Sequence, residues 1–268
     1  MPPSLRMSRG VYLLPNLVTT GGLFSGFYSI IATFKEEYRL AAIAILVALV
    51  FDVLDGRVAR MTKSSSRFGV EYDSLSDLVA FGVAPGVLAY RWALELWGVW
   101  GWLAASLYVV CGALRLARFN VQVEVADKRS FVGLPIPAAA GVIATTILMY
   151  YFLGGEGATT KHITLLLLIY ALGGLMVSTI PYFSFKELPL GRRQPFWILI
   201  LGIILIQLAI AEPQLMLFSV FFFYALSGPI RAVMRLGRGT LQDEDPGRDL
   251  ANQPQQPRTL DNNKKSSL

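Results

Sequence analysis

Four aspartates at helical spacing are the residues of this chain best suited to chemistry. Asp52 and Asp55 are three residues apart and Asp73 and Asp77 are four apart, so each pair would lie on one face of its own helix. Gly56 shares the sector of the first pair and adds no bulk to it. Two such faces that meet would offer only carboxylate oxygens, a ligand set that favours hard divalent cations such as Mg²⁺ or Mn²⁺.

The negative charge of four carboxylates limits which reactions such a site could catalyse. All four acids fall in or beside strongly apolar stretches, where each ionised carboxylate costs about 2.5 to 3.5 kcal/mol or more. Two divalent cations would neutralise four carboxylates, and metal ions about 3.5 to 4 Å apart stabilise the attacking and leaving oxygens of phosphoryl displacements. Two other interpretations fit these residues: interfacial acids paired with nearby basic side chains, and the transit site of a divalent cation transporter.

The elements that must carry these acids are membrane helices. Of 268 residues, 54% are hydrophobic and 16% charged, and the mean hydropathy is +0.52, whereas about a quarter of a soluble domain is charged. Apolar runs of roughly 20 residues, the length that crosses a bilayer, follow one another and exclude a soluble enzyme. We predict an all-α polytopic membrane helix bundle of about eight transmembrane helices. They cover residues 11–34, 39–59, 73–94, 97–117, 134–154, 162–182, 195–211 and 213–233.

The basic residues are distributed unequally between the two sides of this predicted bundle. Most of the 24 Lys and Arg residues fall on the side that holds both termini, and the exceptions are Lys35, Arg39, Arg91 and Lys161. Because short cytoplasmic loops are enriched in Lys and Arg, we expect both termini and the acids at the cytoplasmic face of the cell (inner) membrane. The net charge of +6 then reflects topology and attraction to membrane lipids, with no nucleic acid partner.

Composition divides the chain near residue 237. Residues 1–236 form the predicted membrane-embedded domain, which contains all the candidate site residues. Residues 237–268 are rich in Gln, Asp, Asn, Pro and Lys and hold almost no aromatic or β-branched residues. They cannot bury a core of their own, so we expect a disordered cytoplasmic tail.

Residues 52 to 77 follow the pattern D-x2-D-G-x2-A-R-x8-G-x3-D-x3-D. This pattern resembles the signature of the CDP-alcohol phosphotransferases at each defined position and spacing. The resemblance implies a metal-dependent membrane enzyme that moves a phosphatidyl group from a CDP-linked lipid to an alcohol. It implies that the four aspartates bind two metal ions and that Asp77 also serves as the catalytic base. The residues that it implies for contact with the CDP-lipid are Gly56, Arg60 and Ser66.

Physical chemistry bears on the roles implied for Asp77 and Arg60. A carboxylate bound to a cation is a weak base, so we expect Asp77 to act as base first and as metal ligand second. Arg60 could grip a phosphate bidentately, although positive-inside topology alone would also place an arginine there.

Three further stretches indicate which acceptor is used. They read LLPNLVT from residue 13, CGALRLARFN from residue 111 continuing to FVGLPIPAAA from residue 131, and STIPYFSFK from residue 178. They resemble the bacterial and archaeal membrane-bound phosphatidylserine synthases, which implies CDP-diacylglycerol as donor and L-serine as acceptor, with CMP as leaving group. The family resemblance also implies a homodimer. The alternative is a sibling enzyme with another acceptor, such as glycerol 3-phosphate or inositol phosphate.

Serine carries a carboxylate, so its site needs a cation. Arg115 and Arg118 are the candidates on the predicted cytoplasmic side. An equally good interpretation is that both only set the topology. Other basic residues that compete for the carboxylate are Lys128, Arg129 and Lys186. Asn16 could donate to the nucleotide or its phosphates, or could cap or pack instead.

Overall fold

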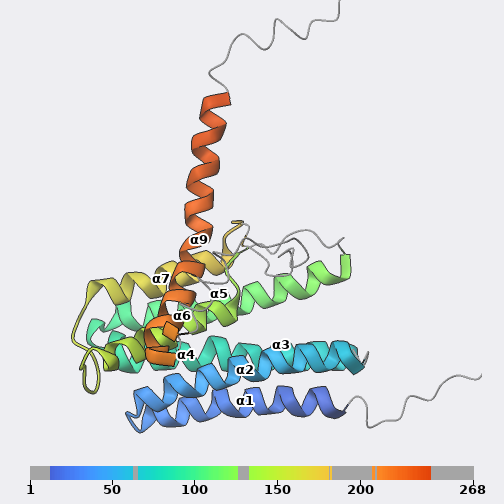
Figure 1. Cartoon of the computed structure of the whole chain (residues 1–268), viewed down its shortest axis with the longest axis horizontal. Helices are drawn as coiled ribbons and strands as arrows, with labels where there is room; N and C mark the ends of the chain where they lie inside the picture. The colour runs from blue at the N-terminus through green and yellow to red at the C-terminus, as the bar shows by residue number, and fades with distance from the viewer. Residues whose placement is uncertain are drawn as a thin grey trace, which may run out of the picture. The chain divides into compact units, whose positions relative to one another are not determined.

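The part of the chain that the structure describes is helical. The computed structural model describes residues 13–62, 66–125, 133–180, 182, 207, 208 and 210–242, and these residues form no strand. Figure 1 shows the α-helices α1 (Leu13–Phe34), α2 (Tyr38–Thr62), α3 (Arg67–Asp77), α4 (Ala84–Ala89), α5 (Val99–Val125), α6 (Ile136–Phe152), α7 (Ile163–Val177) and α9 (Pro213–Gln242). The prediction of an all-α chain is confirmed.

Three of the described helices are long and apolar enough to cross a membrane. The apolar stretches are Leu14–Phe34 in α1, Val99–Val121 in α5 and Pro213–Met234 in α9, and α6 and α7 are shorter apolar helices. Most of the predicted span at 195–211 lies outside the described residues. These helices indicate an integral membrane protein, and the total of eight spans stays a prediction.

Two helices near the acids begin or end away from the boundaries of the predicted spans. The third span was expected from residue 73, but α3 begins at Arg67 because the hydroxyl of Ser66 accepts the N–H of Gly69 (3.0 Å) and caps the helix. The fourth span was expected to end near residue 117, but α5 runs to Val125. The longer α5 places Asn120 on a helix that carries both candidate arginines.

The helix that follows the acids is irregular. A π-helical segment, Leu78–Val83, begins directly after α3, and such segments are frequent at functional sites. Pro85 has no N–H to give to the carbonyl of Phe81 one turn earlier. The buried hydroxyl of Tyr108, on α5, donates to that carbonyl instead (2.9 Å). The bond satisfies a buried acceptor and ties α5 to this segment.

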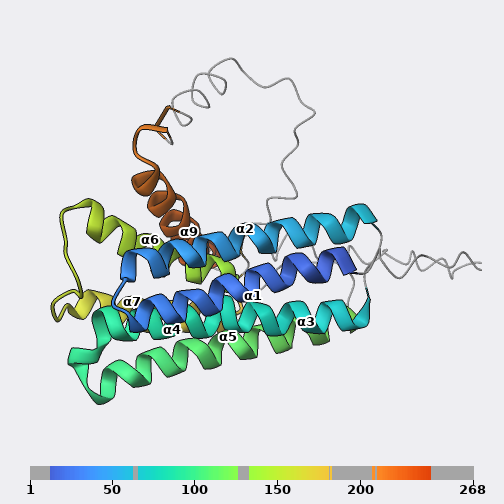
Figure 2. The ribbon, with the colours of Figure 1, turned by 90° about the horizontal axis from the view of Figure 1, so that it is seen from below.

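α1 is the helix against which both acid-bearing helices pack (Figure 2). A Cβ built on Gly26 of α1 would lie 2.5 Å from the Cα of Ala80, so the backbones approach as closely as they do because Gly26 has no side chain. Alanine is the most frequent residue type in the buried core of the described helices. Small residues of this kind allow tight helix packing in membranes, and here they bring α2 and α3 to one common neighbour.

The chain divides into two compact units, Met1–Pro229 and Ile230–Leu268. The first unit contains all the predicted site residues. In the second unit, α9 continues to Gln242, past the predicted start of the tail at residue 237. Residues 243–268 of that predicted tail lie outside the described residues.

Candidate active site

Three of the four aspartates come together between α2 and α3. Asp52 and Asp55 on α2 and Asp73 on α3 each offer a carboxylate oxygen, and these three oxygens lie within 4.8 Å of one another. Helical spacing places each acid on the correct face, and packing of both helices on α1 brings the faces together. We call this group of three the acid cluster.

The acid cluster fits a metal ion. Within the described residues, Asp73 Oδ1 is buried and has no hydrogen-bond partner, which is costly unless something binds it. Carboxylate oxygens of Asp55 and Asp73 also lie within 4.8 Å of each other, where two negative charges repel. A divalent cation would bind the unpaired oxygen and offset the repulsion, and an all-oxygen ligand set suits Mg²⁺ or Mn²⁺.

Asp77 stands apart from the acid cluster. It is the last residue of α3, immediately before the π-helical segment. Its charge interacts with those of all three clustered acids and with that of Arg115 on α5, but the oxygens that lie within 4.8 Å belong to the other three. Asp77 is therefore a near neighbour of the cluster with a charged arginine close to it.

Gly56 and Arg60 lie together beside the buried Asp55. No atom of the described residues lies within 4 Å of a Cβ built on Gly56, so protein packing does not require a glycine there. The Nε of the exposed Arg60 donates to the carbonyl of Gly56 (2.8 Å), one turn back along α2. This stretch of α2 is thus open, and a guanidinium lies next to the opening.

Asn16 and Ser66 meet at the start of α3. A Cβ built on Gly69 would lie 3.2 Å from Ser66 Oγ and 3.3 Å from Asn16 Oδ1. Gly69 is one turn before Asp73, so polar groups of α1 and of the α3 cap gather near the acid cluster. In the structure, the Ser66 hydroxyl is used as a helix cap.

The two candidate arginines have different surroundings. Arg115 is 9% exposed, its Nε has no hydrogen-bond partner among the described residues, and its charge interacts with that of Asp77. Arg118 donates to the carbonyls of Val177 (3.2 Å) and Met176 (3.4 Å) at the C-terminus of α7, where carbonyls lack helical partners. Arg115 therefore belongs to the acid site, and Arg118 joins α5 to α7.

Comparison with known families decides the classification. The model of the CDP-alcohol phosphatidyltransferase family matches residues 12–180, a stretch that includes the acid cluster, Asp77 and both arginines. The chain belongs to the CDP-alcohol phosphatidyltransferase family. The family resemblance that the aspartate pattern suggested is confirmed.

Several relatives of this family member have names that state an activity. A CDP-diacylglycerol-serine O-phosphatidyltransferase of Helicobacter pylori (strain ATCC 700392 / 26695) is 41% identical over 225 residues, 82% of this chain and 91% of the relative. The enzyme of the same name from Mycobacterium tuberculosis (strain ATCC 25618 / H37Rv) is 34% identical over 82% of this chain and 78% of its own length. An archaetidylserine synthase of Methanothermobacter thermautotrophicus is 37% identical over 171 residues, 63% of this chain and 69% of the relative.

Residue spacing did not reveal the hydroxyl and amide contacts around the acids. Ser74 on α3 and Asn120 on α5 contact each other twice, at 3.2 and 3.0 Å, and the hydroxyl of Ser76 donates to the carbonyl of Thr19 on α1 (3.2 Å). Thr19 and Asn120 lie in the stretches that resemble phosphatidylserine synthases, and this resemblance was a sequence signal that could have pointed to them. No local pattern indicates which helix such a side chain touches.

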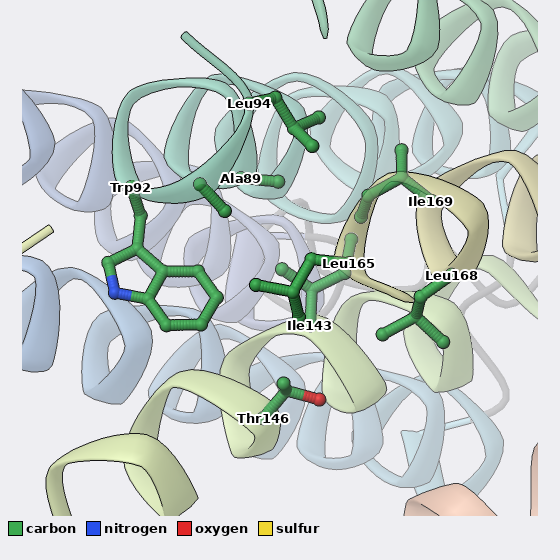
Figure 3. Close-up of a pocket in the computed structure, with 9 residues that line it drawn as sticks. Ala89, Trp92, Leu94, Ile143, Thr146, Leu165, Leu168 and Ile169 are labelled. Atoms are coloured by element: carbon green, nitrogen blue, oxygen red, sulfur yellow. The ribbon is translucent and has the colours of Figure 1, made fainter. Parts of the chain in front are cut away.

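A small apolar cavity elsewhere in the bundle is unrelated to the site (Figure 3). Its lining includes Trp92, Ile143, Leu165 and Ile169, and none of the predicted site residues. It encloses about 10 Å³, which is at the lower limit for one water molecule. We interpret it as a packing void between helices.

Proposed function

We propose that this chain transfers the phosphatidyl group of CDP-diacylglycerol to L-serine, giving phosphatidylserine and CMP. The observation that carries the proposal is the acid cluster, which lies inside the matched family region of a chain whose relatives bear the name of this activity. A cation transporter would leave the glycine and arginine of the motif, Gly56 and Arg60, without a role.

The acid cluster is the proposed metal site, and Asp77 completes it. We propose two divalent cations, Mg²⁺ or Mn²⁺, held by Asp52, Asp55 and Asp73 with Asp77 as an additional ligand. When bound, such ions stabilise the charge that develops on the diphosphate as CMP leaves.

Asp77 is the proposed catalytic base. Its carboxylate takes the proton of the serine hydroxyl while the serine oxygen forms a bond to the lipid-side phosphorus and the bond from that phosphorus to the CMP oxygen breaks. A carboxylate outside the acid cluster keeps more of its basicity than one that is fully engaged with a cation. The position of Asp77 at the margin of the cluster supports this division of roles.

The CDP-lipid is proposed to lie along the open stretch of α2. Gly56 leaves room for the nucleotide, and the guanidinium of Arg60 is placed to exchange its contact with the Gly56 carbonyl for a phosphate. Asn16 and Ser66, which gather at the start of α3, are the proposed additional contacts to the nucleotide.

Arg115 is the proposed partner of the serine carboxylate. It is buried, its Nε has no hydrogen-bond partner within the described part of the chain, and it lies near the proposed base, whereas Arg118 donates to the carbonyls that end α7. We therefore propose that Arg115 contacts the serine carboxylate directly and that Arg118 supports the site by joining α5 to α7. A hydrogen bond between charged groups contributes about 1.5 to 3 kcal/mol.

An Arg115→Gln variant is expected to raise the KM for serine by about 10- to 100-fold, the equivalent of that free energy, while the KM for CDP-diacylglycerol changes little. Initial rates at varied serine measure this. Arg57→Gln, which removes an exposed arginine of α2, is the matched control and should leave both constants unchanged. An unaltered KM for serine in Arg115→Gln would remove Arg115 from the acceptor site.

The membrane arrangement is part of the proposal. The distribution of Lys and Arg supports eight spans, a site at the cytoplasmic face of the cell (inner) membrane and both termini on that side. The proposed boundaries remain 1–236 for the membrane-embedded domain and 237–268 for a cytoplasmic tail, whose first residues continue α9 to Gln242 and whose remainder is proposed to be disordered. A homodimer remains a prediction from the family resemblance.

An acceptor panel tests the function directly. Purified protein in detergent receives CDP-diacylglycerol, Mn²⁺ and one of serine, glycerol 3-phosphate or inositol phosphate, and both CMP and the lipid product are measured. We expect CMP and phosphatidylserine with serine alone. CMP release with a different acceptor, and none with serine, would make the chain a sibling enzyme. Mn²⁺ flux into vesicles without any lipid product would favour a transporter.

A further inference from the structure

Thr19 lies where the two acid-bearing helices meet α1. It is 5% exposed. Its hydroxyl lies 3.0 Å from Oδ2 of Asp55 on α2, and its backbone carbonyl accepts a hydrogen bond from the hydroxyl of Ser76 on α3 (3.2 Å). One residue of α1 thus contacts both α2 and α3 at the level of the acid cluster.

The hydroxyl of Thr19 has one proton and two acceptors within reach. Oγ1 lies 3.0 Å from Asp55 Oδ2 and 3.1 Å from the carbonyl of Pro15, one turn back along α1. A hydrogen bond to an ionised carboxylate is about twice as strong as one to a neutral acceptor. The proton therefore favours the charged Asp55 carboxylate, and this bond restrains the orientation of that carboxylate.

The second contact sets the position of α3. Ser76 is 4% exposed and lies between Asp73 and Asp77 in the sequence. Its bond to the Thr19 carbonyl restrains the turn of α3 that carries both acids. Thr19 thus contacts Asp55 with its side chain and this turn of α3 with its backbone, so one residue of α1 helps to set the position of both acids.

We propose that Thr19 is a positioning residue for the metal site, which orients the Asp55 carboxylate toward the cation through its hydroxyl. The inference rests on the proposed metal-dependent function. Partners of this kind hold the orientation of metal ligands, and their loss typically lowers metal affinity by about 10- to 100-fold.

Two substitutions at Thr19 isolate the hydroxyl from its surroundings. Thr19→Val has nearly the same shape and keeps the backbone carbonyl that Ser76 uses, but it cannot donate to Asp55. Thr19→Ser keeps the donor and loses only a methyl group. The matched control is Thr20→Val, because Thr20 also bonds one turn back, to the Asn16 carbonyl (2.7 Å), and contacts Tyr72 (2.9 Å) without touching an acid.

The measurement is Mn²⁺ binding to the purified protein without substrate, followed by the EPR signal of unbound Mn²⁺. We expect Thr19→Val to raise the Kd by about 10- to 100-fold, Thr19→Ser to stay near wild type, and Thr20→Val to match wild type. A merely structural role would lower the thermal stability of Thr19→Val without this selective change in Kd.

Each contrary result has a distinct meaning. Wild-type Kd in a folded Thr19→Val protein would overturn the positioning role and leave the proposed function standing. Absence of Mn²⁺ binding by the wild type would overturn the metal-dependent function, and the positioning role with it. If Thr19→Val did not fold, Thr19→Ala would take its place, since alanine also lacks the hydroxyl and keeps the backbone carbonyl that Ser76 uses, and an unchanged Kd in that variant would equally overturn the inference.

Discussion

Asp77→Asn protein is expected to release CMP about 10²- to 10⁴-fold more slowly than wild type, the usual contribution of a general base. Asparagine has nearly the same shape but cannot accept the serine proton. Because Asp77 lies outside the acid cluster and is only an additional ligand of the proposed site, its loss should lower Mn²⁺ affinity far less than the loss of Asp73 does. The test compares turnover at saturating serine with Mn²⁺ binding by EPR in the same preparation.

The combination of results defines the role of Asp77. A large loss of turnover with retained Mn²⁺ binding is the signature of a base. Loss of Mn²⁺ binding together with turnover would make Asp77 a metal ligand first. Near-full turnover would contradict both roles. Glu71→Gln is the matched control, because Glu71 is an exposed acid of the same helix, and it should behave as wild type in both assays.

Asp73→Asn is expected to abolish Mn²⁺ binding and to lower CMP release by more than about 10³-fold. Asp73 supplies a buried carboxylate oxygen that has no partner among the described residues, and electrostatic stabilisation by a bound metal is worth several kcal/mol in the transition state. Turnover with CDP-diacylglycerol and serine, and Mn²⁺ binding by EPR, measure the two effects.

The same substitution should stabilise the metal-free protein. In EDTA, the carboxylates of Asp55 and Asp73 repel each other at close range, and a neutral amide at position 73 removes that repulsion. Thermal unfolding in EDTA should therefore occur at a higher temperature in Asp73→Asn than in wild type, and added Mn²⁺ should stabilise wild type alone. A lower unfolding temperature in EDTA would show that Asp73 holds the fold together instead of binding a cation.

Contacts between distant segments separate residues that look equivalent in the sequence. Arg115 and Arg118 are three residues apart on one helix and both were candidates for the serine carboxylate. The structure places the first near Asp77 and the second on the last carbonyls of α7. Ser66 is a similar case, since a residue expected to contact lipid also begins α3 as its cap. The partners of the two arginines belong to other helices, so no local pattern shows them. The partner of Ser66 is the nearby Gly69, and that contact depends on where α3 begins.

The sequence by itself determined the class of protein, the helical content and the pairing of the acids along each helix. These properties depend on hydrophobic run length and on the 3.6-residue repeat, which act over short stretches of chain. The tertiary structure decided that Asp52, Asp55 and Asp73 form the close group, that Asp77 lies beside it, and that Thr19 joins both acid-bearing helices to α1. The rotation and height of one helix against another depend on close contacts such as that of Gly26 with Ala80, which join residues far apart in the chain.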